Sequence, residues 1–372
     1  MSAPFELEKR VAVSAVLRAV GLTSSVFNTL VKGEVLTKED KSPVTIGDFS
    51  AQAAVNTILT SAFPADPIVG EEDAEELRGS EPDAAAQLMR DRITQLANEA
   101  LAKPALPWEK SEWGVGATRS IDQLLDAIDK GNHTGGCSGR MWVLDPIDGT
   151  KGFLRGEQYA VCLGLVVDGV PQLGVLGCPN LPVSPTDSSK GTGALVLAVR
   201  GQGAFQASIP ALLSSSSSTD LDSFFERIEI PAAAPPANEI RTLESVEAAH
   251  SAQGFTAAIA RALGLSAPAN RMDSQAKYAA LARGWNEGHL YLRMPVPGKN
   301  YIEKIWDHAA GNVIVTEAGG IVTDSYGAPL DFGLGRTLGE NKGIIACAPG
   351  IHAQVVEAIK VAREEEKGAG KL

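Results

Sequence analysis

The most informative stretch of this sequence, residues 142–153, reads Trp142-Val143-Leu144-Asp145-Pro146-Ile147-Asp148-Gly149-Thr150-Lys151-Gly152-Phe153. The apolar run 141–144 predicts a buried strand that ends in two carboxylates, Asp145 and Asp148. Pro146 keeps the residue before it extended, and Gly149 permits a sharp backbone turn. We therefore expect both carboxylates to converge on one point, with the Ile147 carbonyl between them as a third oxygen.

A ligand set made only of oxygens favours a hard cation such as Mg²⁺. Residues 149–152 follow as a predicted helix start, where free N–H groups and the helix dipole favour a phosphate. A metal site and a phosphate cradle within one turn indicate a metal-dependent phosphatase. Asp-Pro and Asp-Gly are also common turn formers, so a plain turn is the alternative for this segment taken alone.

Composition narrows the class of protein. The chain has 372 residues, of which 44% are hydrophobic and 21% charged, as in a globular protein of one large or two moderate domains. The net charge of -12 argues against a nucleic-acid backbone or an anionic membrane as a partner. The four cysteines have no paired spacing, so we expect neither a zinc site nor disulfides, and a reducing, cytoplasmic location. The apolar run 11–20 predicts an amphipathic helix rather than a signal peptide or a membrane span.

The order of predicted elements suggests two parts. Periodicity places helices over 5–32, 45–63, 83–103 and 121–130, and strands at 68–70, 141–144, 160–167, 172–177 and 194–200, with a hairpin turn at 201–203. Pro231–Pro236 is the predicted linker. Beyond it, strands at 240–245, 289–292 and 343–346 alternate with helices at 252–263, 304–318 and 351–363. We therefore predict an α+β domain over 1–232 and an α/β domain over 233–372.

Three further segments carry acids that could join this cluster. Glu71 follows the predicted strand 68–70, although an acidic solvated loop is the alternative, because the acidic run continues to residue 76. Asp48 lies in the first turn of a predicted helix, where a capping role is the alternative. Asp307 begins an otherwise apolar helix. It is either an N-cap or a carboxylate that reaches the metal site from the second domain.

Taken together, these segments resemble the inositol monophosphatase superfamily of magnesium-dependent, lithium-sensitive phosphomonoesterases. The resemblance rests on the ordered set Gly70-Glu71-Glu72, Asp145–Thr150 and Trp306-Asp307, and it covers nearly the whole chain. Within the superfamily, the sequence is most similar to the 3'(2'),5'-bisphosphate nucleotidases of the fungal, lithium- and sodium-sensitive type. The segments that carry this closer resemblance are Lys151–Gln158, Val246–Ser251 and Asp273–Tyr278. The resemblance implies a layered αβαβα sandwich.

The resemblance also implies a role for each matching residue. The implied ligands for two or three Mg²⁺ ions are Glu71, Asp145, the Ile147 carbonyl, Asp148 and Asp307. Asp48 and Thr150 are implied to activate the attacking water. The implied substrate contacts are Gly149, Thr150, His250, Ser274, Lys277, Arg293 and Asp307. Local caps and surface charges are the alternative interpretations for the four contacts between 250 and 293, and Arg283 is an alternative to Arg293.

The implied reaction is Mg²⁺-dependent, in-line hydrolysis of the 3'-phosphate of adenosine 3',5'-bisphosphate to AMP and phosphate, in support of sulfate assimilation. 3'-Phosphoadenosine 5'-phosphosulfate would give adenosine 5'-phosphosulfate in the same pocket. The resemblance further implies inhibition by Li⁺, with Na⁺ and Ca²⁺ as additional candidate inhibitors. An inositol (poly)phosphate 1-phosphatase and a catalytically silent nucleotide sensor are the open alternatives. We expect a monomer whose partner is a small nucleotide bisphosphate, with no nucleic acid and no membrane.

Overall fold

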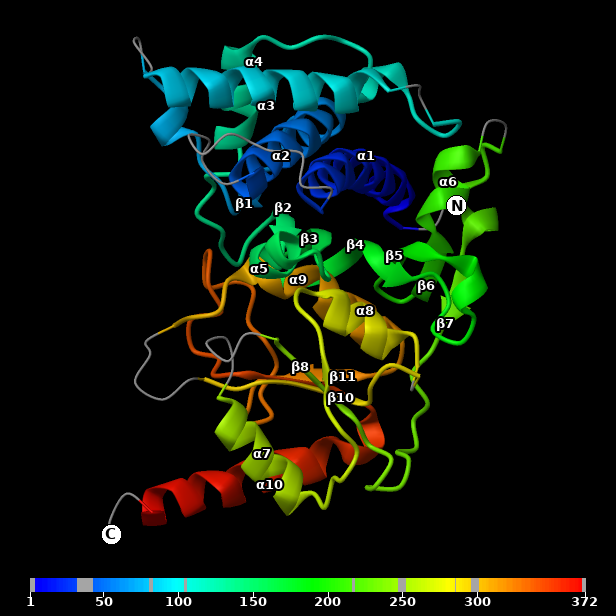
Figure 1. The fold of residues 1–372 in the computed structure, drawn as a ribbon, viewed down its shortest axis with the longest axis vertical. Helices are drawn as coiled ribbons and strands as arrows, with labels where there is room; N and C mark the ends of the chain where they lie inside the picture. Colours follow the sequence, from blue (N-terminus) through cyan, green and yellow to red (C-terminus); the bar gives the residue numbers. More distant parts are fainter. Residues whose placement is uncertain are drawn as a thin grey trace.

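The protein consists of stacked layers in the order helices, sheet, helices, sheet, helices (Figure 1). The structure is a computed structural model, and it describes residues 4–31, 43–79, 83–103, 106–215, 218–246, 252–284, 286–295 and 301–369. The layering confirms the αβαβα arrangement that the sequence resemblance implied. Such stacking is expected when each sheet is apolar on both faces, because each face must then be covered by helices.

The outer helical layer covers one face of the first sheet. It contains α1 (Glu6–Val31), α2 (Pro43–Ala62), α3 (Ala84–Ala102) and α4 (Ile121–Asp129). The prediction of an amphipathic helix is wrong for residues 11–20, because every residue in this range is buried. Burial of Arg18 is possible because its guanidinium pairs with the Glu109 carboxylate at 2.6 Å. The segment Glu6–Leu30 is long and apolar enough to cross a membrane, but 72% of its most apolar window is buried inside the protein, as in a core helix.

The first sheet has the strand order β1-β2-β3-β4-β5-β6-β7. Its strands are β1 (Ile68–Gly70), β2 (Arg140–Asp148), β3 (Ala160–Val167), β4 (Val170–Pro182), β5 (Thr192–Val199), β6 (Gly203–Ser208) and β7 (Glu226–Ile228). β1 runs parallel to β2, and all other neighbours are antiparallel. Short helices α5 (Thr150–Arg155) and α6 (Ile209–Ser214) follow β2 and β6.

The middle helical layer lies between the two sheets and contains α8 (Ala276–Ala282) and α9 (Ala309–Glu317). Small residues allow α9 to approach the first sheet closely. A Cβ at Gly174 would lie 2.5 Å from the Ala310 carbonyl oxygen, which is closer than van der Waals contact allows. α9 therefore holds a fixed position against β4, and this fixes the start of α9, where Asp307 and His308 lie.

The second sheet has the order β11-β12-β10-β8-β9. Its strands are β8 (Thr242–Glu244), β9 (Asn270–Arg271), β10 (Leu290–Arg293), β11 (Ile321–Thr323) and β12 (Ile344–Cys347). α7 (Gln253–Ala262) and α10 (Pro349–Ala369) cover its outer face. Pro231–Pro236 lies in the segment between β7 and β8, where the chain passes from one sheet to the other. The division into domains at 232/233 stays a prediction.

Most predicted elements are confirmed within a few residues, and three differences concern the site. α2 begins at Pro43, so Asp48 lies in its second turn rather than the first, and a capping role is excluded. The helix predicted over 304–318 is split into a 3₁₀ turn, η5 (Ile305–Asp307), and α9, because His308 has a non-helical φ of -138°. The helix α8 was not predicted.

Candidate active site

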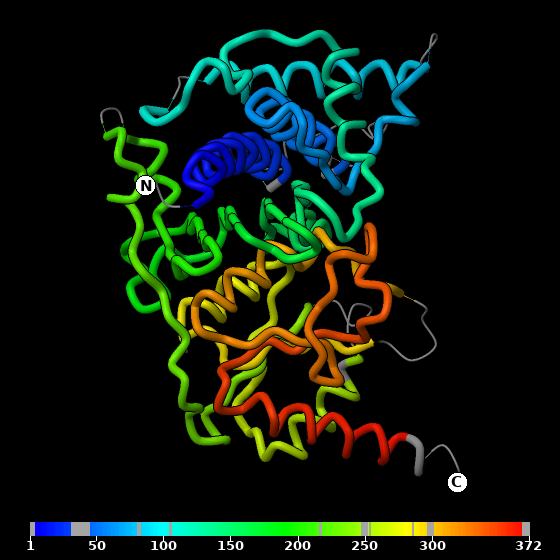
Figure 2. Tube along the Cα trace, turned by 180° about the vertical axis from the view of Figure 1, so that it is seen from behind, coloured from blue at the N-terminus to red at the C-terminus, as the bar shows by residue number. Residues whose placement is uncertain are grey.

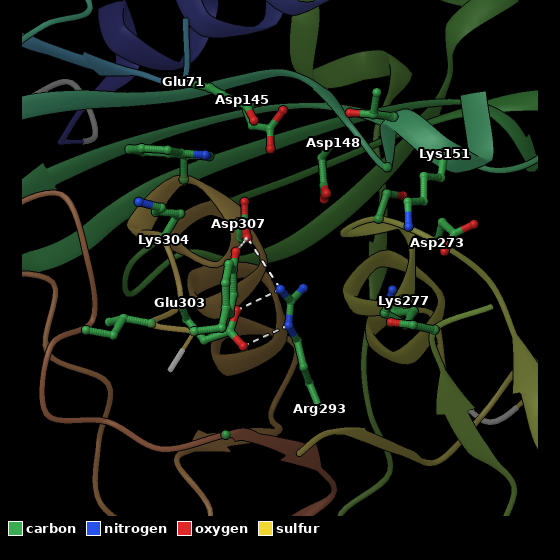
Figure 3. Close-up of a pocket in the computed structure, with 18 of the residues that line it drawn as sticks. Glu71, Asp145, Asp148, Lys151, Asp273, Lys277, Arg293, Glu303, Lys304 and Asp307 are labelled. Atoms are coloured by element: carbon green, nitrogen blue, oxygen red, sulfur yellow. Dashed lines mark hydrogen bonds and ion pairs between the residues drawn. The ribbon is translucent and has the colours of Figure 1, made fainter. Parts of the chain in front are cut away.

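A pocket of about 1070 Å³ opens where the carboxyl end of β2 faces the second sheet. Its walls come from both halves of the chain, including the β2–α5 turn, the residues before α8, the end of β10, and η5. Glu71, Asp145 and Asp148 lie on the side of the first sheet, and Lys277 and Arg293 lie across the pocket from them (Figure 3). Glu303 and Asp307 lie beside Arg293. The volume is that of a typical small-molecule site.

The β2 strand brings Asp145 and Asp148 to the same side. In a regular strand, residues three apart point to opposite faces. Here Asp145 pairs with Cys162 but Asp148 pairs with Ala160, so β2 carries one extra residue at this point. Such a bulge restores both carboxylates to one face, and Pro146, which lacks an N–H, tolerates it. The expected convergence of these two side chains is therefore a consequence of the bulge.

Glu71 is placed beside this pair by strand register. β1 runs parallel to β2 with Gly70 opposite Leu144, so the next residues along the two chains are Glu71 and Asp145. Asp48 approaches Glu71 from α2. Carboxylate oxygens of Asp48, Glu71 and Glu72 lie within 4.8 Å of one another, although Asp48 itself is buried and does not line the pocket.

Asp307 reaches the same point from the second half of the chain. It is the last residue of η5, and its carboxylate lies within 4.8 Å of oxygens from Asp145 and Asp148. Tyr301 donates a hydrogen bond to Asp307 Oδ2 at 3.4 Å. The structure thus brings together the five acids that were predicted to cluster, from four separate segments of the chain.

The carboxylates raise one another's pKa. Burial and the neighbouring Glu71 carboxylate raise the pKa of Asp145 well above its usual value. Burial and Asp307 raise the pKa of Asp148 to about 7. Burial and Asp307 also raise the pKa of Glu71 to about 8, although its side chain is open to the pocket and water screens part of this effect. Burial, followed by Glu71 and Glu72, raises the pKa of Asp48 well above its usual value.

A cation fits this cluster on two grounds. Asp48 Oδ1 and Asp145 Oδ1 are buried side-chain oxygens with no hydrogen-bond partner among the residues that the structure describes. An unpaired buried carboxylate oxygen is costly, and a cation would remove both this cost and the mutual repulsion. The donor atoms are all oxygens, which is the ligand chemistry of Mg²⁺ rather than of zinc or copper.

Lys277 provides a buried positive charge opposite the carboxylates. It lies in the first turn of α8, is 2% exposed, and donates a hydrogen bond to the Met272 carbonyl at 3.1 Å. Its ammonium also lies 5.4 Å from the centre of the Tyr291 ring. Burial lowers the pKa of Lys277 to about 8. The alternative interpretation of this residue as a surface charge is therefore wrong.

Arg293 lies at the end of β10 and is held by a hydrogen-bonded network. Glu303 accepts from its Nε at 2.9 Å and pairs with its Nη2 at 2.8 Å, while Asp307 Oδ2 lies 3.6 Å from Nη2. His308 contacts Glu303 at 3.1 Å and the Tyr278 hydroxyl at 2.9 Å. Burial alone would raise the pKa of Glu303, but Arg293 and His308 lower it to about 2. The guanidinium is thus fixed before any ligand binds.

The turn after β2 is locked against the segment before α8. Gly149 has φ of +89°, and a Cβ there would lie 2.9 Å from the Ser274 Cβ. Ser274 itself has φ of +66°, which a non-glycine residue seldom adopts.

Gln275 connects this turn to η5 and α9. Its N–H donates to Asp148. Its side chain donates to the Trp306 carbonyl at 2.7 Å and accepts from the Gly311 N–H at 2.9 Å. Thr150 Oγ1 lies 3.5 Å from the Ile147 carbonyl oxygen.

Two predicted substrate contacts need separate comment. His250 lies outside the residues that the structure describes. Arg283, the alternative to Arg293, does not line the pocket, because its guanidinium donates to the Pro182 carbonyl and pairs with Glu287. Gln275 and Glu303 were not predicted from the sequence. The one sequence signal for Glu303 was its position four residues before Asp307, in a segment that already carried a candidate acid.

Comparison with known proteins gives a consistent result. A family described as the inositol monophosphatase family matches residues 7–364. The chain is 45% identical to a 3'(2'),5'-bisphosphate nucleotidase of Schizosaccharomyces pombe, with 95% of each chain covered. It is 46% identical to one from Emericella nidulans, with 96% of this chain and 98% of the relative covered.

Solved structures share the fold at lower identity. An inositol monophosphatase from Zymomonas mobilis has a TM-score of 0.56 at 19% identity, covering 97% of this chain and 100% of that chain. CysQ from Bacteroides thetaiotaomicron, a bacterial member of the same family, has a TM-score of 0.56 at 21% identity, covering 93% and 98%. At these identities the structures support the fold alone.

Proposed function

The chain belongs to the inositol monophosphatase family, and from this premise we propose that it is a Mg²⁺-dependent 3'(2'),5'-bisphosphate nucleotidase. It hydrolyses the 3'-phosphate of adenosine 3',5'-bisphosphate to give AMP and phosphate. 3'-Phosphoadenosine 5'-phosphosulfate gives adenosine 5'-phosphosulfate by the same reaction, which is consistent with a role in sulfate assimilation. The names of relatives that are 45% and 46% identical over nearly the whole chain support this substrate class.

The observation that carries the proposal is that Lys277 and Arg293 lie across the pocket from the carboxylates of Glu71, Asp145 and Asp148. One phosphate of a bisphosphate would lie at the carboxylate cluster together with the metal ions. The other would lie against Lys277, which is buried, and Arg293, which is half-buried and also pairs with Glu303. A ligand with two phosphates matches both sides, whereas a monophosphate leaves one of them unused.

Two or three Mg²⁺ ions would be held by Glu71, Asp145, the Ile147 carbonyl, Asp148 and Asp307. The unpaired Asp145 oxygen and the raised pKa of Asp148, to about 7, both support a ligand set that is completed by cations. When bound, Mg²⁺ supplies Lewis-acid stabilisation of negative charge on the phosphoryl oxygens. We further propose inhibition by Li⁺, with Na⁺ and Ca²⁺ as candidates, and a monomeric, cytoplasmic protein without a membrane partner.

The chain's own groups would orient the reactants and move the proton. Thr150 and Asp48 would orient the attacking water and accept its proton; Thr150 lines the pocket, and Asp48 is buried beside Glu71. A carboxylate whose pKa is raised by burial is a stronger base than an exposed one, which suits this role near neutral pH. The backbone of Gly149 and Thr150 would contact the phosphoryl oxygens, and Ser274 would contact the nucleotide.

The direct test is the identity of the product. Purified protein is incubated with Mg²⁺ and adenosine 3',5'-bisphosphate in ¹⁸O-labelled water, and the products are separated by chromatography and mass spectrometry. We expect adenosine 5'-phosphate, with one ¹⁸O atom in the released phosphate, because water attacks phosphorus at the 3' position. Adenosine 3'-phosphate as the product would contradict the proposed orientation of the substrate, and label in the nucleoside would contradict attack at phosphorus.

A further inference from the structure

Arg336 connects the two halves of the chain beside the carboxylate cluster, without lining the pocket. It lies in the segment between β11 and β12, and its guanidinium crosses to the first half of the chain. Nη1 donates to the Gly131 carbonyl at 2.9 Å and to the His133 carbonyl at 3.0 Å. Nη2 donates to the carbonyl of Gly70, the residue directly before Glu71. These hydrogen bonds fix the end of β1 from the side of the second sheet.

The same guanidinium contacts the segment that carries Asp307. Its central carbon lies 4.8 Å from the centre of the Trp306 ring, and Trp306 directly precedes Asp307. The main chain reinforces this contact, because Ile305 N–H donates to the Arg336 carbonyl at 3.2 Å. Arg336 therefore touches the neighbour of Glu71 and the neighbour of Asp307 at the same time, although these two carboxylates belong to different halves of the chain.

Glu71 depends on such external support. The β1 strand ends at Gly70, so within the described parts of the chain strand pairing does not extend to the Glu71 backbone. On its other side, Gln52 of α2 brackets Glu72, accepting from its N–H at 3.1 Å and donating to its carbonyl at 2.6 Å. Arg336 is the matching support on the Gly70 side. Without the hydrogen bond from Arg336 to Gly70, the Glu71 backbone would be held on the Glu72 side by Gln52 but less firmly on the Gly70 side.

Close backbone packing fixes the position from which Arg336 reaches across. A Cβ at Gly135 would lie 2.6 Å from the Gly335 carbonyl carbon, and a Cβ at Gly333 would lie 2.9 Å from the Cys137 Cβ. The segments around 135 and 335 accordingly lie side by side (Figure 2). The backbone around residues 333–335 is therefore fixed by packing, and this fixes the position of the Arg336 main chain from which the guanidinium extends.

We propose that Arg336 is a positioning residue that sets the Glu71 carboxylate relative to Asp307 and so completes the metal site, an inference that rests on the proposed function. An arginine is required because its planar fork serves three carbonyls while one face stacks on Trp306. A lysine could keep the positive charge near the Trp306 ring but could not reproduce the forked set of hydrogen bonds. Partners that orient a metal ligand typically affect metal affinity by about 10- to 100-fold when they are removed.

The test measures Mn²⁺ binding without substrate, by electron paramagnetic resonance and calorimetry, for wild type, R336Q, R336K and the control R363Q. Arg363 is a matched residue, because it also stacks on an aromatic ring (Tyr326, 4.0 Å) and donates to a carbonyl (Ser325, 3.3 Å), but on α10, which covers the outer face of the second sheet. We expect R336Q to weaken Mn²⁺ binding by about 10- to 100-fold, R336K to lose less, and R363Q to match wild type. The Mg²⁺ concentration for half-maximal hydrolysis should rise in the same order.

The outcomes separate the two proposals. Wild type that binds Mn²⁺, together with R336Q and R336K that bind it equally well, would overturn the role of Arg336 and leave the proposed function intact. Equal losses of Mn²⁺ affinity in R336Q and R363Q would also overturn it, because the losses would then reflect a general loss of protein stability. Thermal unfolding in EDTA measures that stability independently. Wild type that binds no Mn²⁺ would overturn the proposed function and this inference with it. If R336Q does not fold, the Mn²⁺ affinity of the conservative variant R336K is compared with that of wild type and R363Q instead.

Discussion

Replacement of Asp148 by Asn should stabilise the metal-free protein while it removes activity. Burial and the Asp307 carboxylate raise the pKa of Asp148 from 3.8 to about 7. This difference of about three pH units, at about 1.4 kcal/mol per unit, corresponds to about 4 kcal/mol for ionising the group in the folded protein. Asn has nearly the same shape, carries no charge, and its oxygen can still accept the hydrogen bond from the Gln275 N–H.

The sign of the pH dependence follows from the raised pKa. Below about pH 3 the Asp148 carboxyl is protonated in the folded and unfolded chains, so wild type and variant should have similar free energies of unfolding. As the pH rises, the unfolded chain releases this proton first, and wild-type stability falls until the folded group ionises near pH 7. The variant should be more stable than wild type by about 2 kcal/mol at pH 5 and up to about 4 kcal/mol at pH 8.

The assay is urea unfolding in EDTA, followed by tryptophan fluorescence, at pH 5 and pH 8. Glu226→Gln is the control, because it removes one negative charge from an exposed position on β7, at the far end of the first sheet. Added Mg²⁺ should stabilise wild type much more than Asp148→Asn. If the free energy of unfolding of the variant at pH 8 in EDTA does not exceed that of wild type, the carboxylates do not destabilise the metal-free protein, and this refutes the argument.

Three further substitutions separate the proposed roles in steady-state kinetics. Thr150→Val should lower kcat by a factor of about 10² to 10⁴ with little change in KM, because it removes a group that orients the attacking water; an unchanged kcat would exclude that role. Lys277→Ala should raise KM for a nucleotide bisphosphate more than for a monophosphate, and equal losses on both would count against its phosphate contact. Glu303→Gln should raise KM for the bisphosphate about tenfold, because it replaces the ion pair that fixes Arg293 with a neutral contact; wild-type KM would show that Arg293 needs no such support.

The local part of the site was predictable from the sequence. A proline between two aspartates and a glycine after them restrict the backbone so strongly that residues 145–150 specify their own turn. Glu71 was also accessible, because an acid directly after a short strand must lie at the strand's end. The extra residue of β2, which aligns Asp145 with Asp148, emerges only from the pairing of β2 with β3.

The supporting contacts were not predictable, because they depend on which distant segments meet. Arg336 and Gly70 are 266 residues apart in sequence. The contacts of Gln275 were hidden for the same reason, since its side chain bonds to backbone groups of Trp306 and Gly311, which are 31 and 36 residues further along the chain. The error at residues 11–20 has the same origin, because a charged Arg18 indicates an exposed helix face unless its distant partner Glu109 is known.

The measurement that tests the central claim most directly is phosphate release across a substrate panel. Adenosine 3',5'-bisphosphate, inositol 1,4-bisphosphate, inositol 1-phosphate and AMP are compared with Mg²⁺, with EDTA, and with Mg²⁺ plus Li⁺, using wild type and Asp145→Asn. We predict strong preference for the nucleotide bisphosphate, loss of release in EDTA and in the variant, and suppression by Li⁺. Preference for an inositol phosphate would contradict the substrate assignment, and release that persists in EDTA or in folded Asp145→Asn would contradict the metal site itself.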